Sequence, residues 1–145
     1  MQPQDPVALT HSHLEQLQQL LRENHLPWQD CEQQLAHFYG YFENQQLLAA
    51  GGLEPAGDSA LLRSVVVDAA SRSQGQGRLM VDFLIQRARD SGINEVYLLS
   101  ETAVDYFAAI GFTVATRASL PEAIRQTRQF QSLCPDDATC MRLKL

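Results

Sequence analysis

The feature that most constrains this chain is a buried strand followed by a glycine-containing turn and an amphipathic helix. Residues 60–67 are apolar and rich in valine except at Arg63 and Ser64, which predicts a strand. Gly75 and Gly77 then precede a helical repeat of apolar residues. The N–H groups at the start of such a helix, together with the helix dipole, favour a negatively charged group. The sequence therefore predicts a site for a phosphate-bearing ligand.

The segment before this turn predicts a helix and a meander of strands. A short strand is expected at residues 7–9, and an amphipathic helix at 12–24, where Ser12 and Glu15 form a capping-box pattern. A short helical segment is expected at residues 27–35. Apolar and aromatic runs separated by polar turns at 43–45 and 55–58 then predict antiparallel strands at residues 37–43, 46–54 and 60–67.

Helices and strands alternate after the turn. The glycine-opened helix is expected to end at Gly92, since glycine tolerates the left-handed conformation that stops helices. The remaining expected elements are a strand at 95–99, a helix capped by Thr102 that stops before Gly111, a strand at 112–116, a helix capped at 119–122 that ends near 133, and a strand at 139–145. Because no repeat or linker interrupts this order, we expect residues 1–145 to form one domain.

Charge and composition exclude several classes of function. The chain has eleven basic and seventeen acidic residues and a net charge of −6, which argues against a nucleic-acid partner. Lys144 is the only lysine, so the sequence offers no polybasic patch for a membrane surface. It has no apolar run of the roughly 20 residues that a membrane span needs, and its start does not resemble a signal peptide. We therefore expect a cytoplasmic protein.

Three cysteines, Cys31, Cys134 and Cys140, fit no zinc-binding spacing. We expect unpaired thiols and no metal centre. A thiol pair of Cys134 and Cys140 that binds a metalloid is the alternative, because thiolates are soft ligands.

Two motifs carry a resemblance to a known family. Arg72, Gly75 and Gly77 follow an Arg/Gln-x-x-Gly-x-Gly/Ala pattern after a strand, and residues 103–112 form a helix that runs into Gly-Phe. The turn has neither the Gly-Lys-Ser/Thr of a P-loop nor the third glycine of a dinucleotide fingerprint. In both motifs, and in the order of its elements, the chain resembles the GCN5-related N-acetyltransferase (GNAT) superfamily.

The resemblance implies a fold and a co-substrate. The fold is a single α/β (α+β) domain with a central mixed sheet of about six or seven strands, flanked by helices, whose fourth and fifth strands splay apart. The co-substrate is acetyl-CoA, with its pyrophosphate on the amides of residues 74–78 and its pantetheine arm along the strand edge at residues 65–67. The implied coenzyme contacts are Val65, Val66, Val67, Arg72, Gln74, Gly75, Gln76, Gly77, Arg78, Ser100 and Phe107.

Acetyl transfer needs a neutral amine, a donor for the developing oxyanion and a proton for the departing thiolate. A backbone N–H at Val65 or Val66 is the expected oxyanion donor, and Glu54 is the expected base, acting through water. The tyrosine that many members of the superfamily use as acid is replaced by Phe107, with Tyr106 beside it as a substitute. Ser100 stands where an asparagine is usual. It is a candidate catalytic residue with Glu54 and Tyr106, and contacts the cofactor or caps the next helix.

Arg63 interrupts an apolar strand, where an unpaired guanidinium would be costly. It either pairs with Glu54 or another carboxylate, or binds an acidic group of the acceptor. Both Arg63 and Glu54 are therefore candidate substrate-binding residues.

Residues 50–145 are most similar, within the superfamily, to small acetyltransferases associated with arsenic resistance, on the segments 61–64, 97–103 and 130–135. The resemblance implies an N-acetyltransferase that acts on a small amine or amino-acid-like acceptor, with an organoarsenical as one candidate. We expect a monomer or homodimer. The alternatives are a noncatalytic acyl-CoA-binding or sensing module and a thiol-based metalloid binder.

Overall fold

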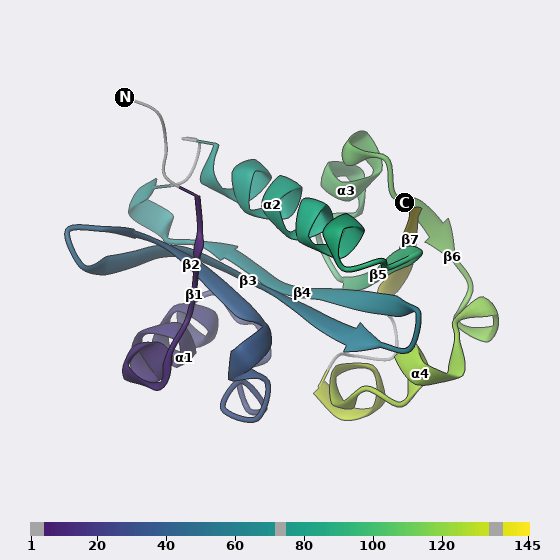
Figure 1. Cartoon of the computed structure of the whole chain (residues 1–145), viewed down its shortest axis with the longest axis horizontal. Coiled ribbons are helices and arrows are strands. Elements are labelled where there is room, and N and C mark those ends of the chain that lie inside the picture. The colour runs from purple at the N-terminus through teal and green to yellow at the C-terminus, as the bar shows by residue number, and fades with distance from the viewer. Residues whose placement is uncertain (1–4, 72–74, 134–137) are drawn as a thin grey trace.

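The strands pair into one mixed sheet (Figure 1) in a computed structural model that describes residues 5–71, 75–133 and 138–145. Within this part of the chain the sheet has seven strands in the order β1-β2-β3-β4-β5-β7-β6. The strands are β1 (Val7–Ala8), β2 (Phe38–Glu43), β3 (Gln46–Ala56), β4 (Ser59–Val67), β5 (Glu95–Ser100), β6 (Thr113–Ala115) and β7 (Thr139–Lys144). The predicted meander corresponds to β2, β3 and β4, which pair antiparallel.

Helices cover both faces of the sheet (Figure 1). One face carries α2 (Gln76–Asp90) and α3 (Val104–Ile110), and the other carries α1 (Leu14–Glu23) and α4 (Glu122–Arg125). The apolar side of α2, which includes Met80, Val81 and Leu84, packs on β3, β4 and β5. Leu62 of β4 and Leu98 of β5 belong to the same core. Beneath the other face, α1 packs through Leu17 and Leu21 on Phe38 and Val66. Val65 and Val67 pack against the first core and Val66 lies in the second, so alternate residues of β4 enter two different cores, as a strand buried on both faces requires.

The sheet opens between β4 and β5. These strands run parallel and pair only over three residues each, Ser59–Leu61 with Glu95–Tyr97. Beyond this segment, within the described part of the chain, β4 pairs only with β3, on one edge, and β5 pairs only with β7. A bulge accompanies the opening, since the register of β3 and β4 shifts between Ala50 and Gly52 and Ser64 has a φ of 58°. The single α/β fold with splayed fourth and fifth strands is therefore confirmed.

Several predicted turns have the expected backbone. Asn44 and Gln45 have φ values of 51° and 67°, as a type I′ hairpin turn between β2 and β3 requires. Gly92 and Gly111 follow α2 and α3 with φ values of 77° and 125°. Both helices end where the sequence predicted, because glycine adopts these angles without a clash at Cβ.

The predicted helix starts were less accurate. A 3₁₀ turn at His11–His13 precedes α1, so the start lies at Thr10, whose N–H donates to Nδ1 of His13 at 3.0 Å, and not at Ser12. The segment at 27–35 forms turns, followed by a 3₁₀ turn at Leu35–His37. Thr102 does not cap α3, whose N-cap residue is Ala103.

The helix expected at 119–133 is divided. It consists of a 3₁₀ turn (Arg117–Ser119), α4, and a π-helical turn, η5 (Gln129–Leu133). The Oγ1 of Thr127 donates to the carbonyl of Ile124 at 2.8 Å and accepts the N–H of Phe130 at 3.3 Å. These side-chain bonds compete with the regular helical ladder, which explains the interruption.

Candidate active site

A cavity of about 620 Å³ lies where the sequence predicted the coenzyme. The edge of β4, the start of α2 and one side of α3 form its walls. It is lined by Asn24, Leu26, Val65, Val66, Val67, Gly75, Gln76, Gly77, Arg78, Ala103, Tyr106 and Phe107. Two of the predicted coenzyme contacts, Arg72 and Gln74, lie outside the described residues.

The start of α2 presents backbone donors to this cavity. Gly75 is the N-cap residue with a φ of 85°, and a Cβ built on it would meet no atom within 4 Å. The first backbone hydrogen bond of the helix joins Leu79 N–H to the Gly75 carbonyl at 3.0 Å. The N–H groups of Gly77 and Arg78 precede it and have no partner within the helix, which suits an anion. The Arg78 side chain is half exposed and pairs with Asp82 at 3.0 Å.

The parted edge of β4 presents backbone groups of a second kind. Asp68 N–H donates to the Leu48 carbonyl at 2.7 Å, so the main-chain groups of Asp68 point toward β3. Because main-chain groups alternate along a strand, those of Val66, opposite Ala50, also point toward β3. The N–H and carbonyl groups of Val65 and Val67 then face the opening.

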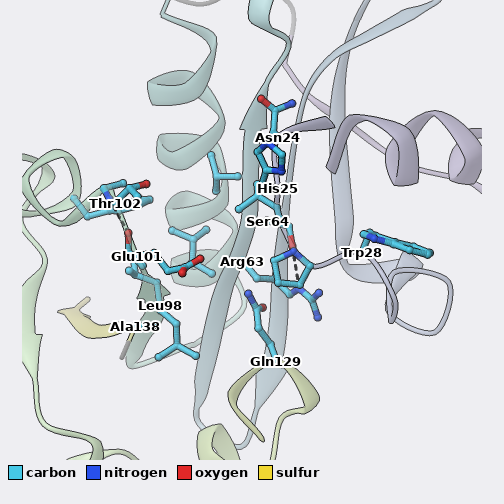
Figure 2. A pocket seen from close by; sticks show the side chains of 18 of the residues that line it. Asn24, His25, Trp28, Arg63, Ser64, Leu98, Glu101, Thr102, Gln129 and Ala138 are labelled. Atoms are coloured by element: carbon cyan, nitrogen blue, oxygen red, sulfur yellow. Dashed lines mark hydrogen bonds between the residues drawn. The ribbon is translucent and has the colours of Figure 1, made fainter. Parts of the chain in front are cut away.

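A second cavity, of about 800 Å³, adjoins the first (Figure 2). Its walls are the bulge of β4, the end of β5 and the loop after α1, and Gln129 and Ala138 close its lower side. Its lining includes Arg22, His25, Trp28, Arg63, Ser64, Leu98, Ser100, Glu101, Thr102 and Gln129. Val65, Ala103 and Phe107 line both cavities, so the two meet beside the edge of β4.

Arg63 is the centre of a buried ion cluster. Its guanidinium makes two bonds of 2.5 Å to the carboxylate of Asp30 and one of 3.1 Å to Oε1 of Glu54. Its Nε donates to the Ser64 hydroxyl at 3.2 Å. Burial alone would lower the pKa of this guanidinium, but Asp30 and Glu54 raise it above its ordinary value. Of the two interpretations of Arg63, the structure therefore shows carboxylate pairing.

Glu54 and Ser100 have structural contacts. The Glu54 carboxylate is bonded to Arg63, and the residue is not among those that line either cavity. A role for Glu54 as base stays a prediction that this position does not favour. The Ser100 hydroxyl lines the second cavity and accepts the N–H of Ala103 at 2.9 Å. It therefore stabilises the start of α3, which is one of the two roles predicted for Ser100, whereas the predicted cap Thr102 does not cap this helix.

Tyr106 and Phe107 lie on the same side of α3 but in different surroundings. The Tyr106 ring is 43% exposed and lies beside Gly77 in the first cavity. Partial burial raises the pKa of its phenol, although the nearby charge of Arg78 lowers it. Phe107 stacks edge-on against Phe112 at 5.7 Å and reaches both cavities. Phe107, the one of these two residues that lies where the cavities meet, thus has no hydroxyl that could donate a proton.

Sequence reasoning missed Asp30, which is the buried partner of the cavity residue Arg63, and several residues that line the second cavity. Asp30 lies 33 positions before its partner Arg63, and no local pattern links them. Glu101 directly follows β5, His25 has a φ of 59° in the loop after α1, and Gln129 lies on η5. Each is a common polar residue in a polar stretch, so only its position in the fold gives it significance.

The two described cysteines, Cys31 and Cys140, are not among the residues that line either cavity. The buried thiol of Cys31 donates to the Trp28 carbonyl at 2.7 Å, and burial raises its pKa to about 11. Cys140 is buried in another core, below α4, while Cys134 lies outside the described residues. Among the described residues there is no cluster of three or more His, Cys, Asp or Glu suited to a metal. In the same part of the chain, every helix is too short or too polar to cross a membrane.

The acetyltransferase (GNAT) family has a family model that matches residues 7–114 of this chain. The chain belongs to this family. The earlier resemblance is thereby confirmed at the level of the superfamily, and with it the enzyme class and acetyl-CoA as its co-substrate. The comparisons give no support to the likeness to arsenic-resistance enzymes.

Solved structures show the same fold at low identity. Rv2747 from Mycobacterium tuberculosis, in complex with CoA, is 21% identical over 98% of this acetyltransferase and 99% of its own chain, with a TM-score of 0.83. The ribosomal-protein-S18-alanine N-acetyltransferase from Escherichia coli is 21% identical over 96% and 92%, with a TM-score of 0.74.

A third similar structure belongs to a longer protein. N-acetylglutamate synthase from Neisseria gonorrhoeae, in complex with coenzyme A and N-acetyl-glutamate, is 19% identical and has a TM-score of 0.79. The match covers 99% of this acetyltransferase but only 35% of the synthase. This chain thus corresponds to about a third of that enzyme, and the likeness shows the fold alone.

Proposed function

We propose that this acetyltransferase moves the acetyl group of acetyl-CoA to the amine of a small or amino-acid-like acceptor. The observation that carries the proposal is the junction of the two cavities at Val65, Ala103 and Phe107. Backbone donors suited to an anion lie on one side of this junction, and a separate polar cavity lies on the other. A coenzyme in the first cavity and an amine in the second would meet there.

The coenzyme site is proposed from backbone geometry. The N–H groups at the start of α2 bind the pyrophosphate, and the Val65 carbonyl and the main-chain groups of Val67 bond the pantetheine amides as a neighbouring strand would. Acetyl-CoA supplies the acetyl thioester when bound. The Val65 N–H faces the opening and is placed to donate to the thioester oxygen, whereas the Val66 N–H is directed at β3.

Acid and base roles are assigned from the sequence. Holding amine and thioester together supplies much of the rate in such transfers, which lowers the demand on any one side chain. Tyr106 has a hydroxyl, but its ring lines the first cavity and not the second. Glu54 as base, Tyr106 as acid and Ser100 as a cofactor contact stay predictions. The same holds for one domain over residues 1–145, a cytoplasmic location and a monomer or homodimer.

The acceptor is proposed only by class. The three similar structures include one enzyme named for N-acetylglutamate and one named for a protein alanine, so the fold accepts unlike amines. A small amine or amino acid suits a cavity of about 800 Å³. An organoarsenical amine stays one candidate, on the sequence resemblance alone.

Thermal shift and thiol release test the proposal. Acetyl-CoA and CoA at one hundred times their dissociation constants should stabilise the protein by about 2.7 kcal/mol. Release of free CoA thiol should then depend on an added amine from a panel that includes amino acids, diamines and aminoalkyl arsenicals. Absence of stabilisation at millimolar ligand would contradict the coenzyme site.

A noncatalytic acyl-CoA-binding module is the second candidate. Phe107 favours it, because the ring at the junction of the cavities has no proton to donate. Stabilisation by acetyl-CoA without thiol release across the whole panel would support this candidate over the enzyme.

A further inference from the structure

The guanidinium at the floor of the acceptor cavity is already paired with carboxylates. Arg63 lines the cavity, but its side chain is fully buried and bonded to both Asp30 and Glu54. One positive and two negative charges leave this cluster with one net negative charge. A second carboxylate brought against it would meet repulsion, whereas a positively charged group would be attracted.

Gln129 adds a hydrogen-bond acceptor to the wall of this cavity. The residue is only 4% exposed, and its carbonyl oxygen Oε1 is buried with no hydrogen-bond partner among the described residues. Figure 2 shows its side chain extending from η5 toward Arg63, at the lower side of the cavity. A buried acceptor without a donor is unfavourable, and this favours movement of the amide toward the cavity, where a donor on a bound ligand would pair with it.

The position of Gln129 is fixed by its neighbours. Phe130 packs in the core below α4, and the Arg117 guanidinium lies 5.0 Å from the centre of its ring. Arg117 also donates to the Ala138 carbonyl at 3.0 Å, which joins η5 to the start of β7. These contacts hold η5, and with it the backbone of Gln129, beside the cavity. Rotation of the side-chain amide by half a turn exchanges its oxygen and nitrogen without moving η5.

Glu101 provides a negative charge on the opposite wall. It follows β5 and is exposed, and Figure 2 places it across the cavity from Arg63. The other guanidinium among the described lining residues is Arg22, which is exposed and lies 4.8 Å from the Trp28 ring. Arg22 thus differs from Arg63 in being exposed and in contact with an aromatic ring.

We propose that the preferred acceptor carries a second hydrogen-bond donor, an ammonium group at its far end, which is bound by Gln129 and Glu101. The inference rests on the proposed function and narrows it from amines in general to diamine-like acceptors. It also sets the chain apart from an enzyme for acidic amino acids, since the cavity floor repels a second carboxylate.

The experiment compares three probes of similar length: 1,5-diaminopentane, pentylamine and glutamate. Their binding to the CoA-saturated protein is measured by calorimetry, and their kcat/KM is measured by thiol release. We expect the diamine to bind about tenfold more tightly than pentylamine, and glutamate to bind more weakly than either. In Glu101→Gln and Gln129→Leu the ratio of kcat/KM for diamine over pentylamine should fall about tenfold, mainly through KM.

Gln131→Leu is the matched control, because Gln131 is exposed on the same helical turn and bonds Gln126. It should keep the diamine preference, and all three variants should keep the KM for acetyl-CoA. Transfer to amines without a diamine preference, or a preference that survives both cavity variants, would overturn the inference and leave the proposed function standing. Diamine-selective binding without any acetyl transfer would support the diamine site and contradict the proposed function.

Discussion

At the scale of single residues, the polar groups buried around Arg63 determine the character of the acceptor cavity. An isolated guanidinium inside a strand is strongly unfavourable, so its position requires carboxylates nearby. Asp30 supplies two bonds from a loop, and Glu54 supplies a third from the neighbouring strand. The cluster joins the loop after α1 to β4, and so fixes one wall of the cavity.

Cys31, next to Asp30, gives a pH-dependent prediction. Burial raises the thiol pKa from 9.0 to about 11, so the unfolded chain releases this proton at lower pH than the folded one. Stability should therefore fall as pH rises from 9 to 11, by about 2 kcal/mol for this group. Denaturant unfolding of the wild type and of Cys31→Ala across this range measures the difference in slope. Parallel slopes would show that the thiol does not titrate in this way.

At the scale of elements, the start of α2 combines a conformational demand with a binding function. Gly75 begins α2 as its N-cap in a left-handed conformation, and the N–H groups that follow it lie at the coenzyme cavity. Gly92 has a similar φ at the other end of the same helix but does not line that cavity. A comparison of substitutions at these two glycines can therefore distinguish the effect of backbone strain from the effect on ligand binding.

Gly75→Ala and Gly92→Ala should each lower the free energy of unfolding by about 1 kcal/mol, because alanine is strained at these angles. A Cβ at either position meets no atom within 4 Å, so no clash adds to this cost. Only Gly75→Ala should also weaken acetyl-CoA binding, by about tenfold. Chemical denaturation and calorimetry measure the two effects. Equal affinities for acetyl-CoA in both variants would show that the turn at Gly75 is purely structural.

At the scale of the whole molecule, the opening of the sheet creates the site. The short pairing of β4 and β5 leaves the far half of β4 without a strand on one side, although its side chains remain in the cores on both faces. The side chains of this segment therefore stabilise the fold, while its main-chain N–H and carbonyl groups on the open edge can bind a ligand. Two cavities with different chemistry meet at this edge.

Amide hydrogen exchange tests this division along β4. Acetyl-CoA should slow exchange at the Val65 and Val67 N–H groups, which face the opening. The Val66 N–H should change much less, since it is directed at β3 in the free protein. NMR spectra with and without the coenzyme resolve the three amides. Uniform slowing over residues 65–67 would indicate general stabilisation and not a strand-like contact.

Local signals allowed much of this protein to be predicted from its sequence. The strand with three valines, the two glycines and the following helix appear in one continuous stretch, because strand pairing, turn geometry and helix amphipathicity depend on residues that are close in the chain. The divided helix near Thr127 was missed, since side-chain bonds that interrupt a helix leave no periodic pattern.

The sequence by itself determined the family, the order of strands and helices, and the turn at which an anion is expected. Only the tertiary structure decided which polar residues share the acceptor cavity. Arg63, Glu101 and Gln129 come from β4, the loop after β5 and η5, and Asp30, the buried partner of Arg63, comes from another loop. Charge balance in a buried site depends on such distant neighbours, because electrostatic interactions are strong there only between groups that the fold places in contact.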